Sequence, residues 1–539
     1  MTENYPHKLK ISLKRVQTFI FEVPKLKAML GANAMLGETM RNVLAELIGN
    51  SGQRLDWPDD ILLTPATCDP LTDKTDTTFH DDPKALYSRG ILARDGGHFI
   101  AVFPTEQAAI DFQEKAEQKL AEMLPGVLYE INISPIADGQ EEKQEKKQQT
   151  VRPPTETQLL QLPVLQVCME TGAQPASNSI KADEQIRYIA QSVQQRMDKG
   201  AEFHAGRTQD IIGLIAERLY PSERKLKIPK DLADIAGGVG KYLALIHADG
   251  NGIGLRYTEW KKTVEKRDFV YREAHGESFY HSMRVVVRKS VVAALSKTFT
   301  DSNGIRPYEI LMLGGDDLLL VCRADKALLF AHAYVQELHK YPLADNKKLD
   351  VALGVVVAQS SYPIHRLHEL AESLASSAKR LYRSMNEDEK TSVIDWQIVT
   401  QSWFPDVAAV RRQSERITYA VNGNEETLLL TQRPYCVLGN NGLEGLLKSA
   451  KPLEKKQKDA SADDQTARSA WRGLRAACEQ GRLTGDMAFA RLSSAIRETL
   501  SGSSGALWQP PDKEVPVYQT RVLDVIDIAE ISRLGVKND

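Results

Sequence analysis

Residues Glu309–Cys322 read EILMLGGDDLLLVC, in which two apolar runs flank Gly314-Gly315-Asp316-Asp317, and this pattern predicts a β-hairpin. Five further elements are predicted around the hairpin: a strand over Leu243–His247 and a helix over 278–299 before it, then a helix over 326–341, a strand over 349–358 and a helix over 367–385. The order β-α-β-β-α-β-α is that of a ferredoxin-like α+β domain.

Three aspartates are expected to meet at one edge of this sheet. Asp249 follows the first strand, in the sequence ADGNGIG, and Asp316 and Asp317 lie at the tip of the hairpin. These two places are neighbours in a ferredoxin-like sheet. Carboxylate oxygens are the ligands of hard cations, so the three residues suit Mg²⁺ or Mn²⁺ and the chemistry of nucleotidyl transfer. The alternative is an ordinary turn with solvated carboxylates, because Gly and Asp are favoured turn residues.

Glycines and basic residues near these aspartates are candidates for binding a triphosphate. The glycines expected to supply positive φ angles and close approach of the backbone to phosphate are Gly250, Gly252, Gly254, Gly314 and Gly315. Lys379 and Arg383 lie four residues apart on the last predicted helix, so their charges share one face and could clamp a polyphosphate. A solvated basic face is the alternative for this pair.

A fainter copy of the same order is predicted near the N-terminus. Its elements are a strand over 9–13, a helix over 25–47, a hairpin over 90–103 and a helix over 106–124. GGHFIAVF aligns with GGDDLLLV from the paired glycines onward, which indicates an internal duplication. On this alignment Arg15 stands near the place of Asp249 and His98-Phe99 stand for Asp316-Asp317, so this copy lacks the carboxylates for metal ions.

The composition is that of a soluble multidomain protein. The 539 residues predict three to four domains, and 42% hydrophobic with 26% charged residues excludes a disordered chain. A net charge of −3 offers no overall basic surface, so any RNA contact must be local. The five cysteines are far apart and form no CxxC pair, which favours a reducing, cytoplasmic location. Neither a signal peptide nor a membrane span is expected, since no apolar stretch approaches about 20 residues.

Polar stretches divide the chain into regions. Residues 137–158 have the composition of a linker, residues 451–466 that of a long exposed loop, and GSSG at 502–505 marks another loop. Four regions follow: the degenerate first copy over 1–135, a linker with helices over 136–228, the carboxylate-bearing copy over 229–400 and a mostly helical domain over 401–539. The pair His80-Asp81 lies in a polar loop without the further His and Asp ligands that an HD nuclease needs.

Most of the chain resembles the large polymerase-cyclase subunit of type III CRISPR effector complexes, which carries two palm domains related to GGDEF cyclases. The segment 15–36 (RVQTFIFEVPKLKAMLGANAML) is similar to that family's first palm, and KYLALIHADGNGIG with LGGDDLLLV is similar to its catalytic second palm. ESLASSAKRLYR, over 372–383, is similar to the closing helix of GGDEF cyclases, whose Lys and Arg contact the triphosphate. LTQRPYCVLGNNGLEGLL, over 430–447, also resembles the family.

The resemblance implies synthesis of cyclic oligoadenylate from ATP at a composite site between the two palms. It implies metal binding by Asp249, Asp316 and Asp317, and a place in nucleotide binding for Asn33, where the family often has Ser. Besides Asn33, two further departures from the family limit what the resemblance implies. The first-palm signature begins within about 20 residues of Met1, so no HD nuclease domain is expected before it. VCMETGAQPA, over 167–176, has Thr171 where the family's zinc ribbon has its second cysteine, so no zinc is expected at Cys168.

The leading hypothesis is therefore a metal-dependent nucleotidyltransferase that makes a cyclic or linear oligonucleotide messenger from NTP, with ATP favoured, in antiviral defence. One alternative is a scaffold or RNA-binding subunit of a ribonucleoprotein, with guide RNA and small effector subunits as partners. Another is a stand-alone GGDEF-like cyclase that works as a homodimer. The sequence leaves open the base, the product ring size, the activating signal and the choice between these assemblies.

Overall fold

The computed structural model describes residues 6–63, 82–136, 166–172, 174–182, 185–204, 226–236, 241–300, 304–400, 406–421, 424–454, 471, 473–501, 505–509 and 517–534. Two of the sequence predictions, the linker over 137–158 and the His80-Asp81 loop, lie outside these residues. Most of the loop predicted over 451–466 also lies outside them.

The second copy forms a six-stranded sheet. Its strands are β7 (Tyr242–Gly250), β8 (Tyr308–Leu313), β9 (Leu318–Arg323), β10 (Val351–Gln359), β11 (Val393–Ile398) and β14 (Tyr435–Cys436), in the order β14-β11-β10-β7-β9-β8. The portion β10-β7-β9-β8 is antiparallel and has the predicted ferredoxin-like order. β11 adds to it in parallel with β10, and β14 pairs antiparallel with β11, so two strands extend the sheet beyond the prediction.

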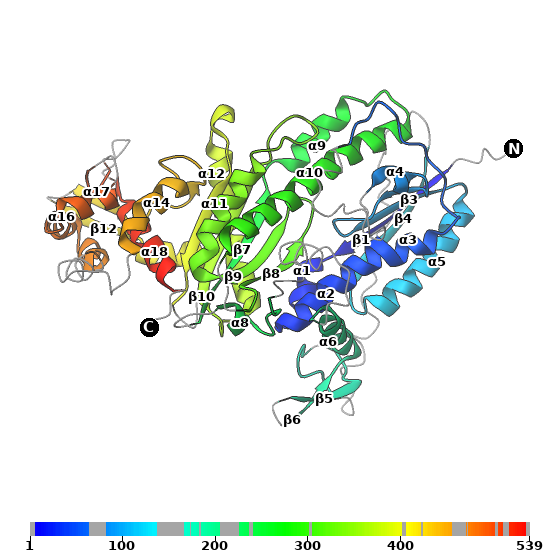
Figure 1. Ribbon diagram of the computed structural model, residues 1–539, viewed down its shortest axis with the longest axis horizontal. Helices are drawn as coiled ribbons and strands as arrows, with labels where there is room; N and C mark the ends of the chain where they lie inside the picture. Colours follow the sequence, from blue (N-terminus) through cyan, green and yellow to red (C-terminus); the bar gives the residue numbers. More distant parts are fainter. Residues whose placement is uncertain are drawn as a thin grey trace.

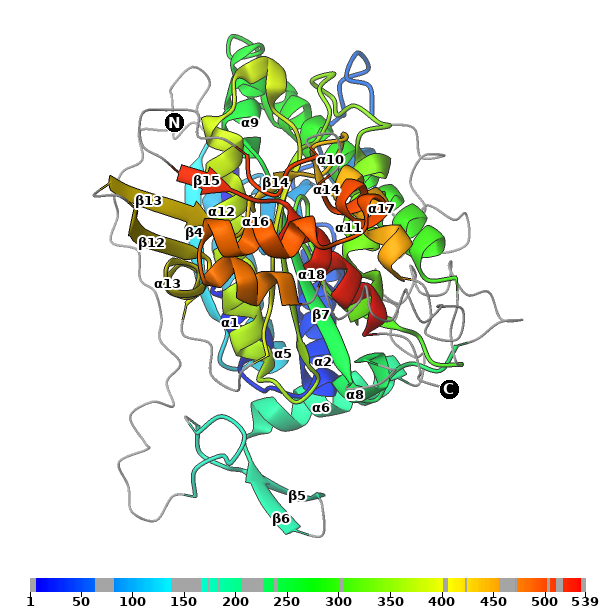
Figure 2. The same ribbon diagram turned by 90° about the vertical axis from the view of Figure 1, so that its left-hand side faces the viewer.

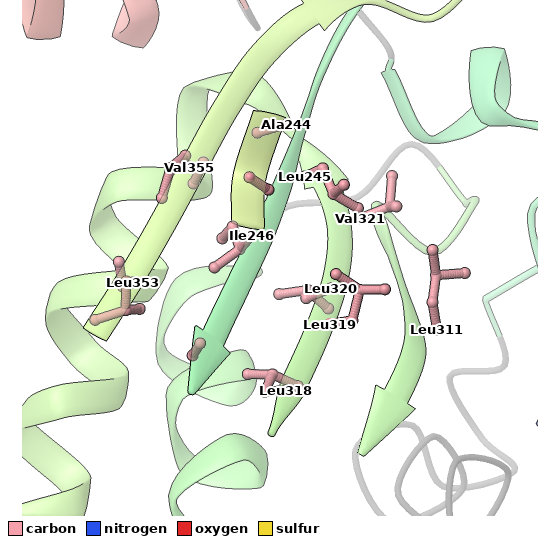
Figure 3. Close-up of a cluster of buried hydrophobic side chains, with 14 of the residues drawn as sticks. Ala244, Leu245, Ile246, Leu311, Leu318, Leu319, Leu320, Val321, Leu353 and Val355 are labelled. Carbon is pink, nitrogen blue, oxygen red and sulfur yellow. The ribbon is translucent and has the colours of Figure 1, made fainter. Parts of the chain in front are cut away.

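Helices bury the apolar strands of this sheet. They are α9 (Ile253–Lys262), α10 (Phe269–Thr298), α11 (Ala327–Leu338) and α12 (Ile364–Ser384), with short 3₁₀ turns at Ala324–Lys326 and Glu387–Glu389. Figure 3 shows the buried side chains of β7, β8, β9 and β10, including Ile246, Leu320 and Val355. The strands are continuous apolar runs because both faces of this part of the sheet are covered.

The first copy is a four-stranded sheet of the same topology. Its strands are β1 (His7–Lys14), β2 (Ile91–Ala93), β3 (His98–Phe103) and β4 (Leu128–Pro135), in the order β2-β3-β1-β4. Its helices are α1 (Val16–Phe21), α2 (Leu26–Glu38), α3 (Leu44–Ile48), α4 (Pro83–Tyr87) and α5 (Glu106–Met123), and a π-helical turn over Thr39–Val43 joins α2 to α3. Figure 1 shows the two sheets side by side.

The strand pairing corrects the alignment of the two copies. β1 pairs with β3 so that Ser12 lies opposite His98, whereas β7 pairs with β9 so that Ala248 lies opposite Leu318. The positions equivalent to Asp249 and to Asp316-Asp317 are therefore Leu13 and Gly96-Gly97, not Arg15 and His98-Phe99. The paired glycines misled the sequence alignment because they occupy different halves of two four-residue turns. The conclusion that this copy lacks the carboxylates is unchanged.

In chain order, a hairpin and two helices lie between the strands of the first sheet and those of the second. The hairpin consists of β5 (Asn178–Ala182) and β6 (Gln185–Ile189) and projects from the rest of the molecule, as Figure 2 shows, and the helices are α6 (Gln191–His204) and α8 (Leu232–Ala236). α6 packs closely on α2. A Cβ at Gly31 would lie 1.9 Å from the Arg196 carbonyl oxygen, and one at Gly200 would lie 2.0 Å from the Lys27 carbonyl oxygen, so both glycines permit this helix crossing.

The C-terminal region contains both helices and strands. Its helices are α13 (Val407–Ser414), α14 (Leu443–Ala450), α16 (Arg482–Ala490), α17 (Ser494–Ser501) and α18 (Val522–Arg533), with a 3₁₀ turn at Lys451–Glu454, and β12 (Arg416–Val421), β13 (Asn424–Leu429) and β15 (Val517–Gln519) form a three-stranded sheet. The prediction of a mostly helical region did not include this sheet. None of the described helices has both the length and the apolar character that a membrane-spanning helix requires.

Candidate active site

Three aspartates converge at the end of the second sheet. Asp249 is the second-last residue of β7, and Asp316 and Asp317 lie in the turn between β8 and β9. The pairing of Ala248 with Leu318 places the end of β7 beside the start of β9. One carboxylate oxygen from each aspartate lies within 4.8 Å of the other two. The fold thus brings Asp249 to the adjacent pair Asp316-Asp317, which begins 67 residues later in the sequence, since 316 − 249 = 67.

The turn that carries two of the aspartates is closed by a 2.8 Å hydrogen bond, which the Gly314 N–H donates to the Asp317 carbonyl. Gly250 packs against this turn. A Cβ at Gly250 would lie 2.7 Å from Asp316 Oδ2 and 2.8 Å from Asp316 Cβ. Any larger residue at position 250 would displace the Asp316 carboxylate from Asp249, so the glycine sets the spacing of the cluster.

The expectation that five glycines take positive φ angles holds for one of them. Gly252 has φ 68° and begins α9, but Gly250, Gly314 and Gly315 lie outside the left-handed region, and Gly254 lies within α9. The hairpin turn is made without left-handed residues, and a helix replaces the phosphate-binding loop expected after β7. Space still limits Gly315, because a Cβ there would lie 2.9 Å from Met283 Cε.

Burial and mutual repulsion make Asp316 and Asp317 hold their protons more tightly than an ordinary aspartate does. Burial, together with the charges of Asp316 and Asp249, raises the pKa of Asp317 from 3.8 to about 7. Burial and the charge of Asp249 also raise the pKa of Asp316. A divalent cation would relieve both the repulsion and the desolvation, and its oxygen-ligand preference matches the three carboxylates. The residues present therefore fit Mg²⁺ or Mn²⁺.

The raised pKa of Asp317 predicts how the stability of the metal-free protein depends on pH. A carboxyl whose pKa is higher in the folded state binds its proton more tightly there, so its contribution to stability falls as pH rises from about 4 to about 7. Asp317→Asn removes this loss. We measure the melting temperature of the variant minus that of wild type, both in chelator. We expect this difference to be at least about 2 °C higher near pH 8 than near pH 5. An equal difference at both pH values would contradict the raised pKa.

Lys379 reaches the aspartates from α12. Its Nζ forms a hydrogen-bonded ion pair with Asp249 Oδ2. The helix is held close to the sheet at Gly354 of β10, where a Cβ would lie 2.0 Å from the Ala371 carbonyl oxygen. Arg383 lies one turn further along α12 and is exposed, and it makes no ion pair with a described residue. The structure therefore brings one of the two predicted basic residues into contact with the carboxylates.

The sequence reading missed Glu372, which also lies beside the cluster. Burial and the charges of Glu369 and Asp249 raise the pKa of Glu372, and Glu372 in turn helps to raise the pKa of Asp317. Glu372 precedes Lys379 by seven residues, which is two helical turns, so both lie on the same face of α12. This spacing is the signal that could have identified it.

A second residue that was missed is His247, two positions before Asp249 on β7 and therefore on the same face of the sheet. It is 5% exposed, and within the described part of the chain neither ring nitrogen has a hydrogen-bond partner. Burial lowers the pKa of His247, so the ring adds no positive charge beside Asp249 at neutral pH.

The first copy contacts the second close to the aspartates. Asp95, in the turn between β2 and β3, lies 3.6 Å from the Nε of Arg284 on α10 and 3.1 Å from Nη1 of Arg41. Met283, the residue before Arg284, packs against Gly315 in the aspartate turn. α10 therefore connects the hairpin turn of one sheet to that of the other, and Figure 1 shows it running from the second sheet toward the first.

Asn33 lies on α2, which packs beside β8, the strand that leads into the aspartate turn. Its side chain is half-buried, and it forms no hydrogen bond with a described residue. The structure therefore places this predicted nucleotide-binding residue on a helix that packs beside β8, and no contact between Asn33 and the aspartates is found among the described residues.

The comparison with known families identifies the second sheet. Residues 242–387 match the model of the second palm domain of Cas10/Cmr2. Residues 242–387 therefore form a palm domain of the Cas10/Cmr2 type. The matched residues run from the first residue of β7 past the end of α12, and so include Asp249, Asp316, Asp317 and Lys379. The resemblance noted in the sequence is thereby confirmed for the second palm.

Solved structures support the same architecture over the whole chain. Crystal structures of a Csm1-Csm4 cassette in complex with cA4 and with AMPPNP each align with a TM-score of 0.52 at 12% identity, over 99% of this chain and 70% of that one. The same cassette in complex with pppApA aligns with a TM-score of 0.51 at 12% identity over the same shares. At this identity the likeness concerns the fold. No curated protein matches the sequence.

The segment that resembles a broken zinc ribbon contains Cys168. Burial would raise the pKa of Cys168, but hydrogen bonds from Thr171, Ala190 and Glu170 outweigh it and lower the pKa. A structural zinc site normally has four ligands. We expect the purified protein to contain less than about 0.1 zinc per chain by metal analysis, and stoichiometric zinc would prove this prediction wrong.

Proposed function

We propose that this Cas10-like palm protein is a divalent-metal-dependent nucleotidyltransferase that joins NTP, with ATP favoured, into a cyclic oligonucleotide, and that it acts in the cytosol as part of CRISPR-type antiviral defence. The observation that carries the proposal is the meeting of Asp249, Asp316 and Asp317 within 4.8 Å, on a palm of the Cas10/Cmr2 type. A turn with a purely structural role would not need three mutually repelling carboxylates, of which Asp317 has its pKa raised to about 7.

The three aspartates would hold Mg²⁺ or Mn²⁺. When bound, such a cation activates a hydroxyl nucleophile and stabilises the charge that develops on the departing pyrophosphate. Gly250 keeps the Asp316 carboxylate close to Asp249, because any side chain at position 250 would overlap it. The fold therefore supplies a fixed set of ligands rather than a flexible acidic patch.

Lys379 would neutralise the triphosphate. In the structure its ammonium group pairs with Asp249, so it already lies at the edge of the carboxylate cluster. An NTP that brings its own negative charge can take over this ammonium group once a cation occupies the carboxylates. Arg383, exposed one turn further along α12, would contact the outermost phosphate as that helix face extends away from the cluster.

The nucleotide that supplies the attacking 3′-hydroxyl would lie between the two palms of one chain. The ion pair between Asp95 and Arg284 links the first palm to the helix beside the aspartate turn. This observation favours a composite site within one chain over a homodimer of a stand-alone cyclase. Asn33, on the helix beside β8, would contribute to this acceptor side.

Other CRISPR subunits are proposed as partners. Two of the structures with a similar fold are of a Csm1-Csm4 cassette, in complex with cA4 and with AMPPNP. We infer a similar complex for this chain, with guide RNA and small effector subunits as further partners. The alternative of a scaffold without catalysis is disfavoured by the retained aspartates.

The test of this function is incubation of the purified chain with Mn²⁺ and each of the four radiolabelled NTPs in turn. We expect ATP to be consumed with release of pyrophosphate and to give a product that resists phosphatase, because a cyclic oligonucleotide has no terminal phosphate. Equal consumption of all four NTPs would contradict the preference for ATP. A product that loses terminal phosphate on phosphatase treatment, seen as a shift in its chromatographic mobility, would contradict cyclisation.

A further inference from the structure

An open cleft of about 870 Å³ lies far from the aspartates. It is formed by the start of α2 in the first palm, by α6 and α8 between the palms, and by the residues next to the start of β7 and the end of β10. Figures 1 and 2 show α8 and α2 close together below the start of β7. Asp249 lies eight residues beyond Lys241, near the other end of β7, which is about 26 Å at about 3.3 Å per residue, so the cleft is separate from the candidate active site.

Four lysines line this cleft: Lys25, Lys27, Lys230 and Lys241. Lys25 is paired with Glu170 at 2.6 Å, so it contributes less than the others to the positive charge of the cleft. The other three form no ion pair with any residue that the structure describes. Lys230 and Lys241 are exposed, and Lys27 is half-buried. Four like charges from three separate parts of the chain therefore face one space, although the protein as a whole has a net charge of −3.

The lining contains one acidic residue, Asp231, which offsets only part of the charge of the four lysines. Asp231 Oδ1 accepts a 2.9 Å hydrogen bond from the Asp234 N–H and so caps the start of α8. The start of α2 adds positive potential, because its first turn has no acidic residue and its N-cap, Lys25, provides no side-chain acceptor. The unpaired N–H groups of this 13-residue helix thus stay available for an anion.

The floor of the cleft is apolar. Leu26, Leu232 and Met197 belong to it, and none of the described lining residues is aromatic. Apolar surface can cover sugar and base, but without an aromatic ring it offers no strong stacking and little choice between bases. The cleft is thus suited to a ligand that has several successive phosphates and whose bases the protein does not distinguish.

We propose that this cleft binds the phosphate backbone of single-stranded nucleic acid over a few nucleotides, without sequence preference. Lys27, Lys230 and Lys241 contact successive phosphates, and the apolar floor covers the sugars. A free mononucleotide has the same phosphate chemistry, but a single phosphate would leave most of these charges without a partner. The proposal is independent of the nucleotidyltransferase activity, since the cleft and the aspartates lie at opposite ends of β7.

The test is binding of the full chain to a fluorescein-labelled oligouridylate RNA of about 12 nucleotides, measured by anisotropy without NTP or divalent metal. Lys230→Gln combined with Lys241→Gln should raise the Kd at least about tenfold. The slope of log K against log salt should become shallower by about 1.4, because each lost phosphate contact on a single strand contributes about 0.7. The matched control is Lys84→Gln with Lys115→Gln, two exposed lysines of the first palm outside the cleft, which should leave both quantities unchanged.

Three results would overturn the proposal: no binding of the RNA by wild type, an equal loss in the control variant, or displacement of the RNA by millimolar uridine 5′-monophosphate, which would indicate a mononucleotide pocket. Both substituted lysines are exposed, so the variant should melt within about 2 °C of wild type. An active protein that fails this binding test would disprove the cleft proposal alone. An inactive protein that passes it would disprove the proposed function alone.

Discussion

The variant Asp316→Ala, Asp317→Ala is expected to lose product formation, a fall of at least about 10³-fold, because two of the three carboxylates that fit a divalent cation are removed. Its melting temperature in chelator should stay within a few degrees of wild type or rise. Burial and mutual repulsion raise the pKa of both side chains, so removing them relieves an unfavourable arrangement in the metal-free protein. Product formation is measured by chromatography of labelled nucleotide and the melting temperature by calorimetry.

A matched control for this variant is Asp59→Ala, Asp60→Ala. These residues are another adjacent pair of aspartates, exposed in the first palm, where Asp60 accepts a 2.9 Å hydrogen bond from the Tyr271 hydroxyl. The control should retain product formation. A large fall in the melting temperature of the Asp316, Asp317 variant would instead indicate that the turn has a structural role.

The second large effect is expected on NTP affinity. Replacing Lys379 and Arg383 with Ala should raise the Kd of a non-hydrolysable ATP analogue at saturating metal by at least about tenfold, the equivalent of roughly 1.4 kcal/mol. Charge-assisted hydrogen bonds to phosphate are commonly worth about 1.5–3 kcal/mol each. Since Lys379 alone pairs with Asp249, the single Lys379→Ala variant should account for most of the increase.

Arg380→Ala is the control for this helix. Arg380 adjoins Lys379 in sequence but lies about 100° around α12 and is exposed, so its removal should leave the Kd unchanged. If calorimetry gives the same Kd for the double variant and wild type, Lys379 and Arg383 form a solvated face, and the placement of α12 against the triphosphate is wrong.

The second palm was largely predictable because its local signals agree with one another. The apolar runs of β7, β9 and β10 and the Gly-Asp turn each indicate one element, and ferredoxin-like topology leaves one place for Asp249 relative to the hairpin. The site prediction located the aspartates and Lys379 for the same reason. The sequence could not show whether Arg383 also reaches the aspartates, because two residues on one helix face can lie at different distances from a site beyond the end of the sheet.

Features that depend on tertiary pairing were not predictable. The two glycine pairs look equivalent in sequence, but strand register matches Gly96-Gly97 with Asp316-Asp317, and register is set by pairing partners rather than by local pattern. Glu372 lies beside the aspartates only because Gly354 lets α12 lie against β10, a close approach of two elements that the sequence pattern of neither element reveals. The sheet of the C-terminal region pairs β13 with the distant β15, which no short window of sequence reveals.

The proposed function requires that Asp249, Asp316 and Asp317 bind a divalent cation, and Mn²⁺ binding measured by electron paramagnetic resonance tests this requirement most directly. Wild type should bind Mn²⁺, more tightly when a non-hydrolysable ATP analogue is present, and the Asp316→Ala, Asp317→Ala variant should lose this binding while the Asp59→Ala, Asp60→Ala variant keeps it. Equal Mn²⁺ binding by wild type and the Asp316, Asp317 variant, in the presence of the analogue, would contradict the central claim.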